Sequence, residues 1–165
     1  LARVVTKIVQ VEGPVHQDEI ARRAASMWGL QRTGGRIISA VEQALDFAVR
    51  QRDIVQKGLF FQPAGKMHVP IRNREDVYSR NLRKPDYLPP VEVRVALEAV
   101  VAAHLGIPQD ELAREVGRLF GFRSTSTLLR QIVDDELKLL VANGTIDNRN
   151  QRLYIAEGTV HHVTA

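Results

Sequence analysis

Two stretches of this chain carry nearly the same residues, and this repeat limits what the chain can fold into. The segment QDEIARRAASMWG, residues 17–29, is matched by QDELAREVGRLFG, residues 109–121. When residue n is placed beside residue n+92, further identical pairs appear on both sides without a gap: Gln17, Asp18, Glu19, Ala21, Arg22, Gly29, Thr33, Val41, Leu45, Val49 and Ile54 all face their own residue type. Solenoid repeats have periods of about 20–50 residues. The longer period therefore indicates two copies of one small domain.

Each copy has the same predicted order of elements. Apolar residues at helical spacing indicate a first helix, and a break containing Gly and Pro separates it from a second helix formed by the repeated segment. Gly29 and Gly121 follow this second helix, as C-terminal caps would. In copy one, we expect the inner face of the second helix to include Ala24 and the pair Met27/Trp28.

A third, longer helix is predicted around residues 33–51 in copy one and 125–143 in copy two. Each copy then closes with alternating residues around a turn, which is typical of a β-hairpin. The bends are expected at Lys57-Gly58 and at Asn148-Arg149-Asn150. The predicted fold is therefore mainly α with short β-hairpin wings, arranged as a tandem winged-helix (helix-turn-helix) repeat.

This organisation predicts four segments. Residues 1–64 form winged-helix domain one, and residues 92–156 form winged-helix domain two. Residues 65–91 form a basic linker with four prolines, whose apolar side chains favour packing on the domains over a free linker. Residues 157–165 form a tail. Because the chain begins without Met, we expect it to be a piece of a longer polypeptide.

Composition excludes several classes of function. The chain is 44% hydrophobic and 25% charged, which is typical of a globular protein. It has neither an apolar run near the roughly 18 residues of a membrane span nor a signal-peptide pattern, so we expect a cytoplasmic location and no membrane partner. With no cysteine, no His-x3-His spacing and no nucleophile grouping, we expect no metal, cofactor or small-molecule substrate. This piece is not expected to be an enzyme.

The net charge of +4 is unevenly distributed along the chain. Residues 1–63 and 64–91 each carry +3, whereas residues 92–165 carry −2. In a helix-turn-helix, the start of the third helix can approach the base edges in the major groove. The residues expected to contact nucleic acid are Arg32, Thr33, Arg36 and Ser39 there, with Lys57, Arg72 and Arg74 as contacts to the phosphate backbone. The alternative is a solvated helix face, which Glu42 and Asp46 on the same helix support.

Copy two is a poorer candidate for nucleic-acid binding. Its third helix carries Arg123 and Arg130 near its start, but Asp134-Asp135-Glu136 follow, and acidic residues would repel phosphate. This charge pattern favours a structural or protein-contact role. The acidic triplet does not predict a metal site, because neighbouring residues on a helix point about 100° apart.

Four segments together resemble one uncharacterised bacterial domain family. They are VEGPVHQDEIARRAASMWGLQRTGGRI at 11–37, VPIRNRE at 69–75, LPPVEVRVALEAVV at 88–101 and IPQDELAREVGRLFGF at 107–122. That family is a domain of unknown function at the C-terminus of large superfamily-one helicase-like ATPases, which often also carry a restriction-endonuclease-like nuclease domain. The resemblance implies a place in a DNA-processing machine, with the motor and nuclease outside this chain.

Two functional hypotheses follow. In the first, the chain is a nucleic-acid-binding accessory module that guides or clamps duplex or forked DNA for a helicase-like ATPase, with RNA left open as the ligand. In the second, it is a protein-interaction or scaffold module that docks onto the ATPase or nuclease domain of the parent chain. Copy two, with its acidic helix, fits the second hypothesis better.

Overall fold

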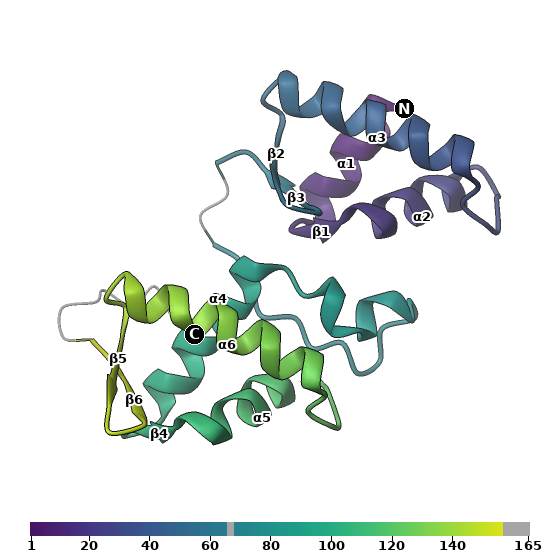
Figure 1. Cartoon of the computed structure of the whole chain (residues 1–165). Coiled ribbons are helices and arrows are strands. Elements are labelled where there is room, and N and C mark those ends of the chain that lie inside the picture. Colours follow the sequence, from purple (N-terminus) through teal and green to yellow (C-terminus); the bar gives the residue numbers. More distant parts are fainter. Residues whose placement is uncertain (66–67, 157–165) are drawn as a thin grey trace. The chain divides into compact units, whose positions relative to one another are not determined.

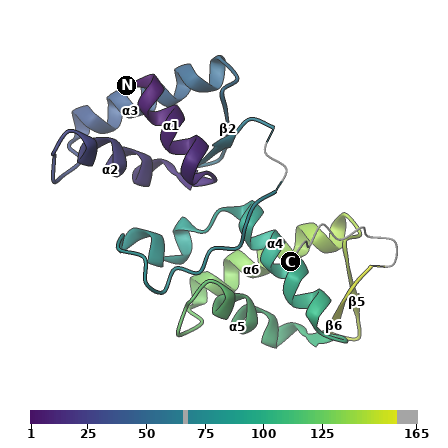
Figure 2. The ribbon, with the colours of Figure 1, turned by 180° about the vertical axis from the view of Figure 1, so that it is seen from behind.

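The chain divides into two compact units. The computed structural model describes residues 1–65 and 68–156, so the predicted tail at 157–165 lies outside the described residues. The first unit is Leu1–Val69 and the second begins at Pro70. Figure 1 and Figure 2 show both units from opposite sides.

Unit one contains three helices and one small sheet. Its elements are α1 (Ala2–Glu12), β1 (Val15–His16), α2 (Gln17–Met27), α3 (Gly35–Arg50), β2 (Ile54–Lys57) and β3 (Phe60–Pro63). The sheet is antiparallel with strand order β1-β3-β2. The hairpin β2–β3 follows α3 as a wing (Figure 1).

Unit two repeats this plan behind an additional N-terminal segment. Residues 70–88 include two short 3₁₀ helices, η1 (Asn81–Arg83) and η2 (Pro85–Tyr87). The repeated elements are α4 (Pro90–Ala103), β4 (Ile107–Pro108), α5 (Gln109–Leu119), α6 (Thr127–Ala142), β5 (Ile146–Arg149) and β6 (Arg152–Ile155). The second sheet has the matching order β4-β6-β5.

The duplication holds at the level of single residues. From β1 to β3, every element of unit one has the bounds of its counterpart in unit two once its residue numbers are raised by 92. The predicted fold class is confirmed: the described chain is mainly helical, with two small antiparallel three-stranded sheets in tandem winged-helix-like units.

The repeated apolar positions form the two cores. In α3, Val41, Leu45 and Ala48 are buried, and this spacing places them on one face of the helix. Their counterparts in α6 are likewise buried in the core of unit two. The third helix of each unit is therefore held against its neighbours by the residues that the repeat keeps apolar.

The wing turn of unit two differs from the prediction. β5 and β6 pair Asn148 with Leu153 and Arg149 with Arg152, so the bend is at Asn150-Gln151 and not at Asn148-Arg149-Asn150. Both bend residues have positive φ, 54° and 62°, as a tight two-residue hairpin turn requires. The short strands β1 and β4, which complete the sheets, occupy the breaks expected between the first and second helices.

Candidate nucleic-acid interface

The start of α3 presents polar side chains to solvent. Arg32, Arg36 and Ser39 are exposed, and Thr33 is half-buried. The helix begins after Gly34, which has no side chain to cap the first amide groups. Nothing lies within 4 Å of the position that a Cβ would take on Gly34. The backbone amides at this helix end are therefore open to an anion between two exposed arginines.

Lys57 lies on a different part of unit one. It is exposed at the end of β2, and the adjoining wing turn is beside the start of α2, where the Gln17 amide donates to the Leu59 carbonyl at 2.9 Å. The loop with Arg32 follows the other end of α2. Since α2 has 11 residues, its two ends are roughly 16 Å apart, and the two cationic points lie beside opposite ends of this helix.

Most cations of unit one form no ion pair. Among the described residues of this unit, only three acids lack a cationic partner: Glu42, Asp46 and Asp53. The cations without an acidic partner there are Arg3, Lys7, Arg32, Arg36, Arg50, Arg52 and Lys57. Unit one therefore exposes more uncompensated positive than negative charge, which attracts polyanions.

Unit two neutralises most of its cations locally. Arg118 pairs with Glu115 at 3.0 Å, Arg123 pairs with Glu75 at 3.1 Å, and further pairs are Arg94–Glu136, Arg114–Glu111, Lys138–Asp135 and Arg149–Asp147. This surface offers less free positive charge to a phosphate.

The acidic triplet of α6 points in separate directions, as expected. Glu136 accepts from Arg94 on α4 at 2.6 Å. Hydrogen bonds from Gln131 and Lys138 hold the pKa of Asp135 below its ordinary value, and Asp134 lines a groove instead. Among the described residues, no group of three or more His, Cys, Asp or Glu could hold a metal ion.

Arg74 is not available to a phosphate, which corrects the expectation for this residue. It is buried in unit two, where its guanidinium donates to both carboxylate oxygens of Glu92 at 3.0 and 2.8 Å. Arg72 binds the same carboxylate through its amide at 2.7 Å and its guanidinium at 2.7 Å. The single buried carboxylate of Glu92 thus forms ion pairs with two arginines. The predicted site is divided between the units, because Arg72 and Arg74 belong to unit two and hold residues 70–75 against the rest of that unit.

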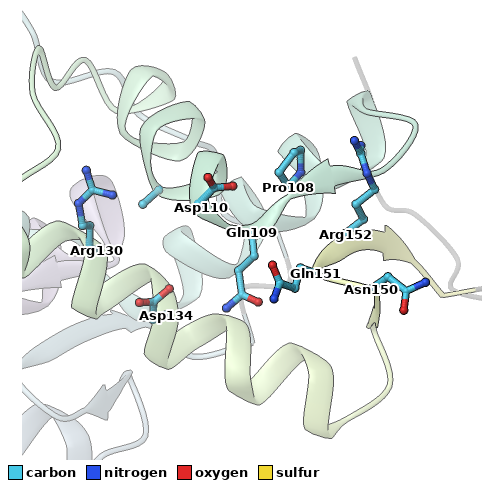
Figure 3. A pocket seen from close by; sticks show the side chains of 9 residues that line it. Pro108, Gln109, Asp110, Arg130, Asp134, Asn150, Gln151 and Arg152 are labelled. Carbon is cyan, nitrogen blue, oxygen red and sulfur yellow. The ribbon is translucent and has the colours of Figure 1, made fainter.

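Sequence reasoning also missed a groove in unit two. Its volume is about 600 Å³, and it lies between the start of α5, the first half of α6 and the wing turn. Figure 3 shows Arg130 and Asp134 on α6, with Gln109 at the start of α5 and Gln151 at the turn. Arg152 from β6 also lines the groove. Its lining is polar and carries both signs of charge.

The two units differ at the residues of this groove. The positions that match Arg130 and Arg152 are Ile38 and Phe60 in unit one. These two differences are visible when the copies are aligned, and they could have indicated the groove from the sequence. The units therefore share a fold but present different chemistry beside the third helix.

The placement of Met27 and Trp28 corrects a further expectation. Both side chains are exposed and not on the inner face of α2. The helix ends at Met27, and Trp28 is its C-cap; Phe120 is the C-cap of α5 and is nevertheless buried, so the end of the helix does not by itself explain the exposure of Trp28.

These features define a tandem winged-helix-like chain whose first unit carries unpaired exposed cations at the start of its third helix. A family described as "Protein of unknown function (DUF3320)" matches residues 1–39, which include α1, α2 and the start of α3. No curated protein and no solved structure matches the chain significantly. Across the described ranges, none of the helices combines the length and the apolar character needed to cross a bilayer.

Proposed function

We propose that the chain is a nucleic-acid-binding accessory module that contacts duplex or forked DNA through unit one. The observation that carries this proposal is the pair of exposed, unpaired arginines, Arg32 and Arg36, beside the uncapped start of α3. A third helix that follows a helix-turn-helix is the element that such proteins place in the major groove. Thr33 and Ser39 supply hydroxyl groups at the same helix end.

In this proposal, electrostatics provides most of the affinity. Arg32 and Arg36 neutralise phosphates on one side of unit one, and Lys57 holds the backbone at the wing. Each phosphate contact changes the slope of log K against log salt by about −0.9 for duplex DNA. The resemblance to domains at the end of helicase-like ATPases supports a role in guiding or clamping DNA beside a motor elsewhere in a longer polypeptide.

Fluorescence polarisation with labelled duplex, forked and single-stranded DNA tests the proposal. In the double variant Arg32→Ala/Arg36→Ala, loss of two phosphate contacts should lower the salt slope by about two and weaken binding roughly hundredfold at about 50 mM salt. Both side chains are exposed, so the variant should remain folded. The matched control, Arg123→Ala/Arg130→Ala in unit two, should have a much smaller effect.

Two results would overturn this assignment. If the intact chain binds none of the DNA forms even at about 50 mM salt, where phosphate contacts are strongest, the nucleic-acid proposal fails. If the unit-two control is the more damaging variant, nucleic acid is bound by unit two and the roles of the units are reversed.

A second candidate function is a protein-contact module, and the charge of unit two favours it. The described cations of unit two are largely paired with acids, as with Arg123 and Glu75, and its groove is lined by amides together with both signs of charge. We propose docking onto the ATPase or nuclease domain of a parent chain as this alternative. It predicts that deleting residues 1–165 from the parent abolishes activity without reducing DNA affinity, and unchanged activity contradicts it.

A further inference from the structure

The end of α2 carries an exposed apolar patch. Met27, Trp28 and Leu30, here named the Trp28 patch, are 66%, 52% and 47% exposed. Gly29 lies among them with φ +70°, and nothing is within 4 Å of the position that a Cβ would take on it. Three large apolar side chains in four residues leave apolar surface in contact with water, which costs free energy and marks a surface for a partner.

Unit two shows what covers this position in the same fold. Phe120, which matches Trp28, is completely buried. The Arg74 amide donates to the Phe120 carbonyl at 2.9 Å, and the Arg74 guanidinium lies 5.1 Å from the centre of the Phe120 ring. A Cβ on Gly121 would be 2.5 Å from the Asn73 side chain and 2.8 Å from the Glu75 amide nitrogen. Residues 71–75, here named the covering segment, therefore pass directly over the end of α5.

We propose that the Trp28 patch is the docking site of an extended peptide segment that carries an arginine and is supplied by polypeptide outside residues 1–165. α2 and α5 have equivalent bounds in the repeat, so a segment shaped like residues 71–75 fits the end of α2. Its arginine would stack on the indole of Trp28, the best aromatic partner for a cation. This docking is inferred from the exposure of the Trp28 patch and not from the proposed DNA contact, although both would use Arg32.

The charges beside the patch specify the segment further. In unit two, Glu75 follows Arg74 and pairs with Arg123 at 3.1 Å. The position that matches Arg123 is Gln31, next to Arg32, which forms no ion pair among the described residues. A carboxylate directly after the arginine of the docked segment would meet this cation. The partner is thus an extended peptide with an adjacent arginine and acid.

Trp28 makes the proposal directly measurable, because it is the sole tryptophan of the chain. The probe is a blocked synthetic peptide with the sequence of residues 69–77, titrated into the intact chain. We expect a saturable blue shift of Trp28 emission and reduced quenching by acrylamide. Replacing the peptide's counterpart of Arg74 by Ala should weaken binding about two- to thirtyfold, the range of cation–π contributions.

A second probe is a copy of the segment joined covalently to the chain, so that the test does not depend on the affinity of a free peptide. A copy of residues 69–92 joined ahead of Leu1 places the covering segment where the repeat has it and raises its effective concentration to about millimolar. Trp28 emission of this fusion should be blue-shifted without added peptide, and the Arg-to-Ala change within the copy should reverse the shift.

Matched variants separate the patch from general effects. Leu30→Glu should abolish the response to peptide, whereas Phe47→Glu, at an equally exposed position on α3 (48%), should leave it intact. The neutral variant Leu30→Gln should also weaken the response to peptide, but it should leave DNA binding through Arg32 and Arg36 intact because it adds no acid beside Arg32, so failure of one proposal is distinguishable from failure of the other.

Three outcomes would overturn the docking proposal. The first is that neither the free peptide nor the tethered copy protects Trp28. Alternatively, Trp28 becomes protected as protein concentration rises without peptide, which would assign the patch to a second copy of the chain. Finally, short oligothymidine and not the peptide quenches Trp28 in a way that Leu30→Glu abolishes, which would assign the patch to stacked bases.

Discussion

Replacing Glu92 by Gln should release the covering segment from unit two. The Glu92 side chain is fully buried and accepts hydrogen bonds from both Arg72 and Arg74. Removing one partner of a buried ion pair costs about 3–5 kcal/mol, because the other charge is left uncompensated. Arg72 is partly exposed and can hydrate, and Arg74 keeps its bond to the Arg72 carbonyl at 2.7 Å. The expected cost is therefore about 3 kcal/mol, the low end of that range.

Amide hydrogen exchange measured by NMR reports this loss of stability directly at the covering segment. At about 1.36 kcal/mol per factor of ten, the Arg74 amide of Glu92→Gln should lose about 150-fold of its protection, while Leu45 in unit one should be unaffected. The control Glu111→Gln removes an exposed carboxylate 3.4 Å from Arg114 and should cost less than about 0.5 kcal/mol. A change below about threefold at Arg74, or an equal change at Leu45, would refute the reasoning.

The same cluster predicts a pH dependence. Burial alone raises the pKa of Glu92, but hydrogen bonds from Arg74 and Arg72 and their charges outweigh it, so the pKa lies below the ordinary 4.5. The folded state therefore binds fewer protons than the unfolded state in this range. Its stabilisation is complete above about pH 4.5 and is lost as the pH falls through the folded-state pKa. The protection factor of Arg74 should fall on acidification in wild type and stay flat in Glu92→Gln; a rise in wild type would contradict the sign.

Two further pairs of variants test local features of the repeat. For both pairs, stability is measured by urea denaturation, and hydrogen exchange monitors each unit separately. Gly121→Ala should destabilise its unit by about 1–3 kcal/mol more than Gly29→Ala does, because both backbones have positive φ but only Gly121 is in contact with the covering segment; equal costs would show that the contact is not tight. Ser126→Ala should cost about 1 kcal/mol, since the hydroxyl of Ser126 caps α6. Gly34→Ser should stabilise unit one by only a few tenths of a kcal/mol, because Gly34 caps α3 without a side chain and has open space around it, and glycine is itself a tolerated N-cap; a loss of stability would show that its backbone does not suit a capping serine.

The repeat made much of the fold predictable. The third helices were expected at 33–51 and 125–143 and are found at Gly35–Arg50 and Thr127–Ala142. This succeeded because identical apolar residues at helical spacing, such as Val41 and its counterpart, report a buried face directly.

The candidate site was only partly predictable, because its remaining features depend on contacts distant in the sequence. Arg72 and Arg74 contributed to the basic charge of their segment, yet their partner Glu92 is 18 to 20 residues away, and no periodicity connects them. Trp28 and Phe120 match as aromatic residues in the repeat, and Trp28 was expected on the inner face of its helix. Their exposures differ because burial of Phe120 requires the covering segment, which precedes the second copy and lies outside the aligned residues.

The covering segment also means that the duplicated unit and the folding unit are not the same length. A truncation that begins at residue 92 keeps every strand of unit two, all of α5 and α6 and nearly all of α4. It nevertheless removes both guanidinium groups from Glu92 and uncovers the ring of Phe120. A truncation that begins at Pro70 keeps them. An expression fragment designed from the boundaries of the repeat would therefore contain a buried carboxylate without a counter-charge, whereas one that starts 22 residues earlier would contain a complete core.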